Sequence, residues 1–364
     1  MINQHNPAWT VCIPILSLSV FALYFIFPNF FGIIFLLALA LIASVICSVH
    51  HAEVIAHKVG EPFGTLVLAL SVTIIEVALI VSMMMSGGAE VMGLARDTIF
   101  AAVMIILNGI IGLSLIVGGR KHLIQAFNLE GITAALGVMI VIIFLALVIP
   151  NFLTSSQVPG VLINSQLIFI SVLTLILFGA FTAFQTIGHR EYFLPVIQEN
   201  APKIEKQDEP SPGKKTAFIS LFFLILSLIA VVLCAKAISP SLETFLNHQG
   251  APLATLGILI AAIVLLPEFG AAMRAALANR LQSSLNLAIG SAIASIGLTI
   301  PTVALIAACM DWPLELGLDG KSTVMLILSL LIVSNSLRTG NTTILPGIVH
   351  VAIFIAYLFF SFVP

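Results

Sequence analysis

Apolar runs long enough to cross a lipid bilayer recur along nearly the whole sequence. A membrane-spanning helix needs about 20 mostly apolar residues, whereas a membrane-spanning β-strand alternates between polar and apolar residues over about ten. The runs in this sequence do not alternate, so they predict helices. They cover residues 11–27, 30–49, 63–85, 98–118, 132–149, 161–186, 217–235, 251–272, 283–307, 323–337 and 343–362. We therefore expect an all-α polytopic membrane protein with about eleven transmembrane helices.

The composition agrees with a membrane protein and excludes other classes. Hydrophobic residues make up 60% of the chain and charged residues only 8%, which is far from a soluble composition. The net charge of −2 and the lack of a basic stripe predict no nucleic-acid binding. The four cysteines lie in or beside apolar runs without CxxC spacing, so we expect them to pack as small apolar residues. The N-terminus has neither the basic region nor the cleavage site of a signal peptide, so the first apolar run should be retained.

One long polar insert, residues 188–216, divides the apolar runs into two groups. It contains Pro202, Pro210 and Pro212 and is predicted to be a linker. Five helices on each side of it, after one extra N-terminal helix, would enter the membrane from opposite sides, as inverted repeats require. The predicted organisation is a first helix in residues 1–29, a first repeat in 30–187, the linker in 188–216 and a second repeat in 217–364.

The distribution of Lys and Arg predicts the orientation. If the N-terminus is cytoplasmic, eleven of these cations fall on the cytoplasmic side, and only Arg96, Lys236 and Lys321 fall on the other side. Membrane proteins carry their excess of Lys and Arg in cytoplasmic segments. We therefore expect the N-terminus and the linker in the cytoplasm and the C-terminus on the outer side.

Two carboxylates lie inside apolar segments, one in each half of the chain. Glu76 follows Gly64 by about 18 Å of helix, so it is well inside a hydrocarbon layer about 30 Å thick. In the second half, Gly250-Ala251-Pro252 precedes an apolar segment that runs up to Glu268. An ionisable side chain at such a depth is costly and by default indicates an ion or proton path. Another acid, Glu61, is expected near the cytoplasmic mouth of the first of these segments.

The two buried glutamates are expected to bind a cation rather than to form salt bridges. No Lys or Arg lies within one helical turn of Glu76, and Arg274 is six residues beyond Glu268, outside the i+3 and i+4 positions. A partner from another helix remains the alternative. Hard cations such as Ca²⁺ bind carboxylate and carbonyl oxygens, and backbone opened at Gly and Pro can supply the latter. The same carboxylates can bind protons instead, so competition between cation and protons would allow exchange.

Small and polar residues near the glutamates are candidate supporting residues. They are Ser71, Thr73, Asn108, Gly290, Ser291, Ser295 and Thr299. Thr73 precedes Glu76 by three residues and can share its helix face. Small residues also let membrane helices pack closely, and for Ser291, Ser295 and Thr299 both interpretations stay open. For Asn108, in the middle of a predicted span, we favour a functional role.

The histidines form one cluster and one isolated position. The sequence HHAEVIAH, residues 50–57, is not the HExxH motif of a zinc protease. We interpret it as a solvated cluster at the membrane surface, with pH sensing as the alternative. His350 lies inside the last predicted span, where an interhelical hydrogen bond is more plausible than a ligand role.

The segments HKVGEPFGTLVLALSVTIIEVAL and PEFGAAMRAALANRLQSSLNLAIGSAIASIGLTIP resemble the calcium/cation antiporter superfamily, in particular its ChaA-type calcium/sodium–proton antiporters. The resemblance extends over nearly the whole chain. It implies that Glu76 and Glu268 are the paired cation and proton sites of two inverted repeats, in a bacterial inner membrane with a periplasmic C-terminus. The wider superfamily has GNxxE before each glutamate. Thr73 and Leu265 occupy the asparagine positions here, so Na⁺ and K⁺ are alternatives to Ca²⁺.

We therefore predict a secondary antiporter that exports Ca²⁺, or alternatively Na⁺ or K⁺, in exchange for protons by alternating access. Its partners would be inorganic cations, protons and the lipid bilayer, and no cofactor is expected. A Na⁺ or K⁺/H⁺ antiporter with little Ca²⁺ transport and a passive cation channel are the alternatives. An intramembrane enzyme is less expected, because no nucleophile–base pair or trio of metal ligands occurs at a shared depth.

Overall fold

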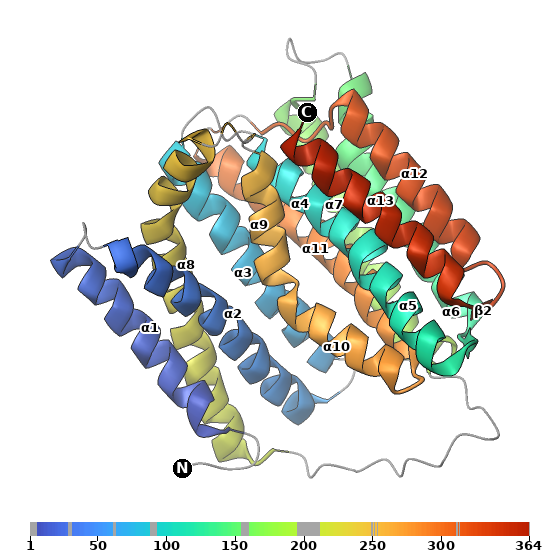
Figure 1. Ribbon diagram of the computed structural model, residues 1–364, viewed down its shortest axis with the longest axis horizontal. Coiled ribbons are helices and arrows are strands. Elements are labelled where there is room, and N and C mark those ends of the chain that lie inside the picture. The colour runs from blue at the N-terminus through green and yellow to red at the C-terminus, as the bar shows by residue number, and fades with distance from the viewer. Residues whose placement is uncertain are drawn as a thin grey trace. The chain divides into compact units, whose positions relative to one another are not determined.

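The computed structural model describes residues 6–27, 31–60, 63–87, 93–153, 160–194, 212–248, 250, 252, 254–310, 312 and 314–363 (Figure 1). These residues are mostly helical, with a single two-stranded sheet. The α-helices are α1 (Ala8–Ile26), α2 (Phe31–Val59), α3 (Phe63–Gly87), α4 (Leu94–Met104), α5 (Ile111–His122), α6 (Leu129–Ile143), α7 (Asn164–Ala183), α8 (Lys214–His248), α9 (Ala254–Val264), α10 (Leu266–Leu277), α11 (Leu281–Cys309), α12 (Gly320–Ser336) and α13 (Ile344–Phe362). Shorter π and 3-10 segments are η2 (Ile105–Ile110), η3 (Phe144–Val148), η4 (Ile149–Phe152), η5 (Phe184–Gly188) and η6 (Arg190–Phe193), and the strands are β1 (Gln125–Ala126) and β2 (Asn341–Thr342).

The described helices account for most of the predicted membrane crossings. Nine of them are long and apolar enough to span a bilayer, with α4, η2 and α5 forming one continuous span. The pair α9 and α10, bent by 53°, could make a tenth crossing, and α12 is a shorter apolar helix. Each of the eleven predicted apolar segments overlaps one of these spans, the bent pair or α12. The all-α polytopic fold is therefore confirmed, while the count of eleven crossings stays a prediction.

The elements divide into two compact units. Unit 1, residues 1–91 and 198–250, contains α1, α2, α3 and α8, and unit 2, residues 92–197 and 251–364, contains the other described elements. Each unit draws helices from both sides of the linker, and in unit 1 helix α8 packs against α1, α2 and α3. The compact units are thus not the two halves of the sequence. The inverted symmetry of residues 30–187 and 217–364 stays a prediction.

A proline inside α1 creates a polar contact between α1 and α2 in unit 1. Pro14 has no backbone N–H, so the carbonyl of Thr10, four residues earlier, lacks its helical donor. Inside a membrane span such a carbonyl needs another partner. The His51 Nε2 of α2 donates to the Thr10 oxygen at 3.0 Å, and the Cys47 thiol donates to it at 3.1 Å.

The position of His51 corrects the prediction of a solvated histidine cluster. His51 is 0% exposed, and its ring stacks on Phe223 of α8. His50 packs against Trp9 of α1, and only His57 of the three histidines is exposed. The physical reason is the unsatisfied carbonyl in α1, which binds the imidazole N–H inside the helix interface.

We predict that His51→Ala destabilises unit 1, because the Thr10 carbonyl would keep only a weak thiol donor in apolar surroundings. The free energy of unfolding should fall by about 1–3 kcal/mol, measured by denaturant unfolding of the purified protein in detergent. His57→Ala, on the same helix but exposed, is the matched control and should change little. Equal losses for the two substitutions would contradict the assigned contact.

Unit 2 is built around the continuous span of α4, η2 and α5, which is the most buried of the candidate spans. This span packs against α9, α10, α11, α12 and α13. Glycines allow the close approach of these helices: a Cβ at Gly257 of α9 would lie 2.7 Å from the α4 backbone, and a Cβ at Gly347 of α13 would lie 2.7 Å from the Gly112 carbonyl oxygen. A buried hydrogen bond of 2.9 Å joins Ser284 of α11 to Ser114 of α5.

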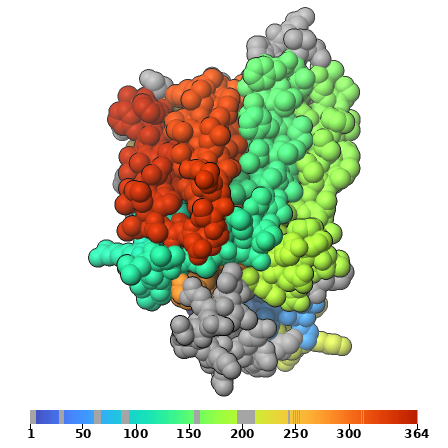
Figure 2. All heavy atoms as spheres, turned by 90° about the vertical axis from the view of Figure 1, so that its right-hand side faces the viewer, coloured from blue at the N-terminus to red at the C-terminus, as the bar shows by residue number. Residues whose placement is uncertain are grey.

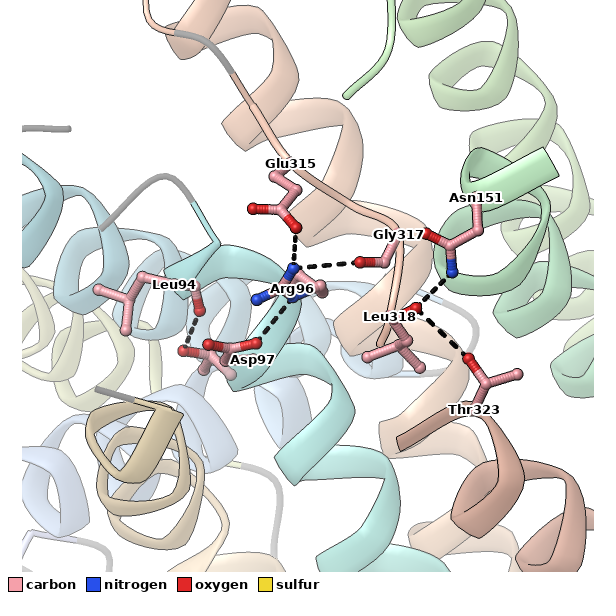
Figure 3. Close-up of polar contacts among 9 residues, drawn as sticks. Leu94, Arg96, Asp97, Asn151, Glu315, Gly317, Leu318 and Thr323 are labelled. Carbon is pink, nitrogen blue, oxygen red and sulfur yellow. Dashed lines mark hydrogen bonds and ion pairs between the residues drawn. The ribbon is translucent and has the colours of Figure 1, made fainter. Parts of the chain in front are cut away.

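At one end of unit 2, Arg96 connects the start of α4 with the loop before α12 through ion pairs and a hydrogen bond (Figure 3). Its guanidinium binds Asp97, with Nε 2.8 Å from Oδ1, and it also binds Glu315. It donates to the Gly317 carbonyl oxygen at 3.1 Å. Asn151 of η4 donates to another carbonyl oxygen of the same loop. This polar cluster therefore holds the start of the central span of unit 2 against the loop before α12.

The opposite end of the same helices carries the sheet, in which β1 pairs antiparallel with β2. Of the three cations that were predicted on the outer side, Arg96 and Lys321 lie in the first turns of α4 and α12, and Lys236 belongs to α8 of unit 1. Two cations that were predicted in the cytoplasm, Arg120 and Arg338, lie where α5 and α12 end. Within unit 2, the cations predicted on the outer side and those predicted in the cytoplasm thus lie at opposite ends of the helices.

Candidate functional site

Glu76 lies in the middle of α3, in unit 1. Its side chain is 2% exposed, and α3 continues without a break from Phe63 to Gly87. The predicted supporting residues Ser71 and Thr73 are also buried. Both hydroxyls donate to carbonyl oxygens one turn earlier, at 2.8 and 2.9 Å. Each hydroxyl oxygen keeps lone pairs that can accept a hydrogen bond or bind a cation.

Glu268 lies in unit 2 directly after a break in the helix. Helix α9 ends at Val264 and α10 begins at Leu266, and the two are bent by 53°. The proline at position 267, in the first turn of α10, explains the break, since it has no N–H to donate to the carbonyl of Ile263 and its ring clashes with that carbonyl in a continuous helix. Glu268 is 8% exposed, so its carboxylate is buried next to backbone that the break has opened.

The N-terminus of α10 stabilises negative charge on Glu268. The glutamate is in the first turn of α10, and Arg274 is in the last. The first backbone N–H groups of a helix lack helical acceptors and carry partial positive charge, which favours a carboxylate there. Glu76 lies in the middle of α3, so the N-terminus of its own helix does not stabilise its negative charge. The two candidate carboxylates therefore differ in how strongly their helices favour the charged form.

The far end of α10 is held by the segment that follows α5. Lys121 Nζ and His122 Nε2 both donate to the Leu277 carbonyl oxygen at 3.0 Å, and the Gln125 side chain donates to the Ala276 carbonyl oxygen at 3.0 Å. Basic and amide groups at a helix C-terminus satisfy carbonyls that have no helical donor. Helix α10 is therefore anchored at the end opposite to Glu268.

Helix α11 packs against α10 and carries the other predicted supporting residues of the second half. Ser295 and Thr299 are buried, whereas Gly290 and Ser291 are half-buried. The neighbouring Gly297 packs against α7, since a Cβ there would lie 2.8 Å from the Phe178 Cβ. The small residue at this position of α11 thus allows close packing against α7, in line with the interpretation that small residues serve helix packing.

Asn108 lies in η2, the π-helical turn of the central span. Its Nδ2 donates to Ser329 Oγ of α12 at 2.8 Å, and its Oδ1 accepts from His350 Nδ1 of α13 at 3.1 Å. All three side chains are 0% exposed. The interhelical hydrogen bond that was predicted for His350 is confirmed. The role of Asn108 in ion binding stays a prediction, and its contacts join three helices around a π-helical turn, a feature often found at functional sites.

We predict that Asn108 and His350 are energetically coupled. Asn108→Ala and His350→Ala should each lower stability, and a double-mutant cycle should give a coupling of about 1 kcal/mol, typical of hydrogen bonds between membrane helices. Unfolding in detergent measures all four proteins. Ser291→Ala combined with Asn108→Ala serves as the control cycle and should be additive, since no hydrogen bond links Ser291 with Asn108 in the described part of the chain. Additive losses for Asn108 and His350 would overturn the assignment.

The predicted site residues fall into both units. Glu76, Ser71 and Thr73 belong to unit 1, and Glu268 belongs to unit 2. The other members in unit 2 are Asn108, Gly290, Ser291 and Ser295, and Glu61 lies outside the described residues. The pairing of Glu76 with Glu268 therefore stays a prediction. In the described part of the chain, no three His, Cys, Asp or Glu side chains converge on a metal site.

Sequence reasoning missed the break before Glu268, which is the most distinctive feature around this residue. The signal was Pro267 itself, because a proline after a helical run marks a probable boundary at the preceding residue. From the sequence we instead singled out Gly250-Ala251-Pro252, which precedes the apolar segment. Of these three residues the structure describes Gly250, with a φ of 64°, and Pro252.

Comparison with protein families identifies relatives over nearly the whole chain. The family model described as sodium/calcium exchanger protein matches residues 29–187 and 219–363. The y4hA protein of Sinorhizobium fredii is 42% identical, covering 100% of this chain and 98% of that protein. The sodium-potassium/proton antiporter ChaA of Escherichia coli is 35% identical, covering 98% of this chain and 97% of that protein.

A solved structure shares the fold. The crystal structure of the H⁺/Ca²⁺ exchanger CAX superposes with a TM-score of 0.72 and covers 96% of this chain and 87% of that one. The sequence identity is 14%, so the likeness concerns the arrangement of helices alone.

Proposed function

Because this chain belongs to the sodium/calcium exchanger family, we propose that it exchanges a monovalent cation, Na⁺ or K⁺, for protons, with Glu76 and Glu268 binding both. It is a multi-pass membrane transporter and not an enzyme. We place the N-terminus and the 188–216 linker in the cytoplasm and the C-terminus in the periplasm, as the distribution of Lys and Arg predicts. Proton entry would then drive cation export.

The position of Glu268 is the observation that carries this function. A buried carboxylate in the first turn of a half-helix, preceded by a proline that cannot donate to the Ile263 carbonyl, brings the two oxygen types that bind hard cations into one segment. Discontinuous helices with this arrangement are typical of the substrate sites of secondary transporters.

Exchange follows if cation and protons compete for the same oxygens. An ionised Glu268 binds a cation, and a protonated Glu268 lacks the negative charge for it and keeps fewer acceptor sites. Because an isolated buried charge is costly, a glutamate that releases its cation favours protonation. Glu76, whose helix does not favour the charged form, would carry a proton more readily than Glu268. The two carboxylates together would thus couple opposite fluxes.

We propose a monovalent cation because few side-chain oxygens flank the two glutamates along the chain. Leu265, the N-cap residue of α10, is buried and brings no oxygen, and Thr73 brings a single hydroxyl. Ca²⁺ takes about 6–8 oxygen ligands, which is a larger set than these positions supply. The printed name of the Escherichia coli relative, a sodium-potassium/proton antiporter, supports the same choice.

Ca²⁺ is the second candidate. It is favoured by the presence of two buried glutamates, whose combined charge when ionised equals that of a divalent cation. Backbone carbonyls near the break and ordered water would have to complete its ligands. A transport assay that compares cations decides between the two.

We predict that Glu76→Gln and Glu268→Gln each abolish exchange, because the substitution keeps the shape and removes the charge. Everted vesicles with an acid interior and a fluorescent pH reporter would receive Na⁺, K⁺ and Ca²⁺ in turn. Glu130→Gln is the matched control, since Glu130 is an exposed glutamate of unit 2, and it should transport like the unchanged protein. Proton release on cation addition in either glutamate variant would refute the assigned role. Cation flux without proton movement would indicate a channel.

Leu265→Asn should raise Ca²⁺-dependent proton release relative to the Na⁺ and K⁺ responses, because it adds a carbonyl oxygen three residues before Glu268. The same vesicle assay measures the ratio of responses. Leu266→Asn is the control, since Leu266 is 41% exposed, and it should leave the ratio unchanged. An unchanged ratio in a Leu265→Asn protein that still transports Na⁺ or K⁺ would show that this position does not set cation choice.

A further inference from the structure

The turn that ends α5 has an unusual backbone. Leu123, directly after α5, has φ 64° and ψ −60°, and the Ile124 N–H donates to the His122 carbonyl oxygen at 2.8 Å. This is a γ-turn with positive φ, a rare and strained form. Glycine adopts positive φ without a steric penalty, yet a leucine occupies the position. A strained residue of this kind persists only where its surroundings hold it, and it often marks a functional position.

Contacts on both sides hold the turn. The Leu123 N–H donates to the Gly119 carbonyl oxygen at 2.9 Å and so closes the last turn of α5. On the other side Gln125 pairs with Thr342 in the β1–β2 sheet. Lys121 and His122, just before the turn, donate to the end of α10. The turn is therefore a fixed projection of unit 2.

Exposed apolar side chains cluster on this projection. Leu123 is 76% exposed, the highest value among the large hydrophobic residues of the described chain, and Ile124 is 58% exposed. The exposed Ile344, at the start of α13, adjoins the last turn of α5, because a Cβ at Gly119 would lie 2.8 Å from its backbone nitrogen. We call Leu123, Ile124 and Ile344 the α5 tip. Figure 2 shows the blue-green end of α5 projecting below the red helices α12 and α13.

The length of the central span matches an α5 tip at the depth of lipid headgroups. The span from Leu94 to His122 has 29 residues. At 1.5 Å per residue it is about 43 Å long, which exceeds the hydrocarbon layer of about 30 Å and matches the thickness of a bilayer with its headgroup regions. Exposed cations flank the tip: Arg120 and Lys121 precede it, and Arg338 precedes β2. Glu130, at the start of α6, is an exposed acid in the same region.

We propose that the α5 tip is an interfacial anchor that binds an anionic phospholipid. Leu123 and Ile124 enter the boundary between headgroups and acyl chains, and Arg120 binds the headgroup phosphate. Apolar side chains beside Lys and Arg are the combination that attaches protein segments to anionic membrane surfaces. The fixed turn presents the apolar side chains without the loss of conformational freedom that a flexible loop would suffer. The anchor would hold the α10 end of unit 2, which the same segment contacts, at a constant depth.

Tryptophan fluorescence in nanodiscs tests this anchor. In a Trp9→Phe, Trp312→Phe background, Leu123→Trp and Ile124→Trp place the reporter at the tip, and Thr339→Trp places it at an exposed polar position before β2. Brominated phosphatidylglycerol, brominated phosphatidylcholine and aqueous iodide are the quenchers. We expect blue-shifted emission at both tip positions, strong bromine quenching, and preference for the anionic lipid. Arg120→Gln should reduce that preference about fivefold, the effect of one basic residue at an anionic surface.

Three results would overturn the inference. Iodide quenching of the tip reporters equal to that of Thr339→Trp would place the tip in water. Shielding from both bromine and iodide would show that protein covers the tip, for example the acidic part of the 188–216 linker or a second copy of the chain. Equal quenching by the two brominated lipids would show that the tip does not prefer an anionic headgroup. Using two tip positions keeps the test valid if one of the substitutions prevents folding.

Discussion

A backbone carbonyl that loses its helical donor inside a membrane has to find another partner, and this constraint organises both units. In unit 1, Pro14 deprives the Thr10 carbonyl of its donor, and the His51 imidazole and Cys47 thiol of α2 take its place. In unit 2, Pro267 does the same to the carbonyl of Ile263, directly before a buried glutamate. The first proline thus leads to a helix–helix contact, and the second leaves the Ile263 carbonyl without its helical donor in the segment that carries Glu268. The same local chemistry serves packing in one unit and the candidate site in the other.

The two candidate carboxylates are placed differently, and the difference bears on how an antiporter could work. Glu268 benefits from the N-terminal end of α10, whose other end is held by Lys121, His122 and Gln125. Glu76 is embedded in an unbroken helix with back-bonded hydroxyls beside it. If both groups bind cation and proton in turn, the charged form is favoured more at Glu268. Such asymmetry allows the two sites to fill in order rather than together.

Apolar run length predicted the helix positions well, because in a membrane nearly every spanning residue must be apolar and helical. It predicted the bend at Pro267 poorly, since a proline in a span can either kink or end a helix, and only packing decides. His51 was expected in solvent because histidine is polar, but its true partner is a carbonyl on another helix, which no local pattern contains. The prediction for His350 succeeded because a polar residue inside a span has few options other than a neighbouring helix. The grouping of helices into units depends on contacts between distant segments, which run lengths do not contain.

The composition of unit 1 has a consequence for how the protein is made. Helices α1, α2 and α3 leave the ribosome first, but the helix that packs against all three, α8, ends at His248. Unit 2 is likewise incomplete until α13 has been synthesised, since α13 packs against α5. Neither unit can finish folding from the first half of the chain alone, so early helices must wait in the bilayer with their packing faces against lipid. The hydrogen bond from His51 to Thr10, by contrast, joins α1 directly to α2, so it can form before α8 has been synthesised.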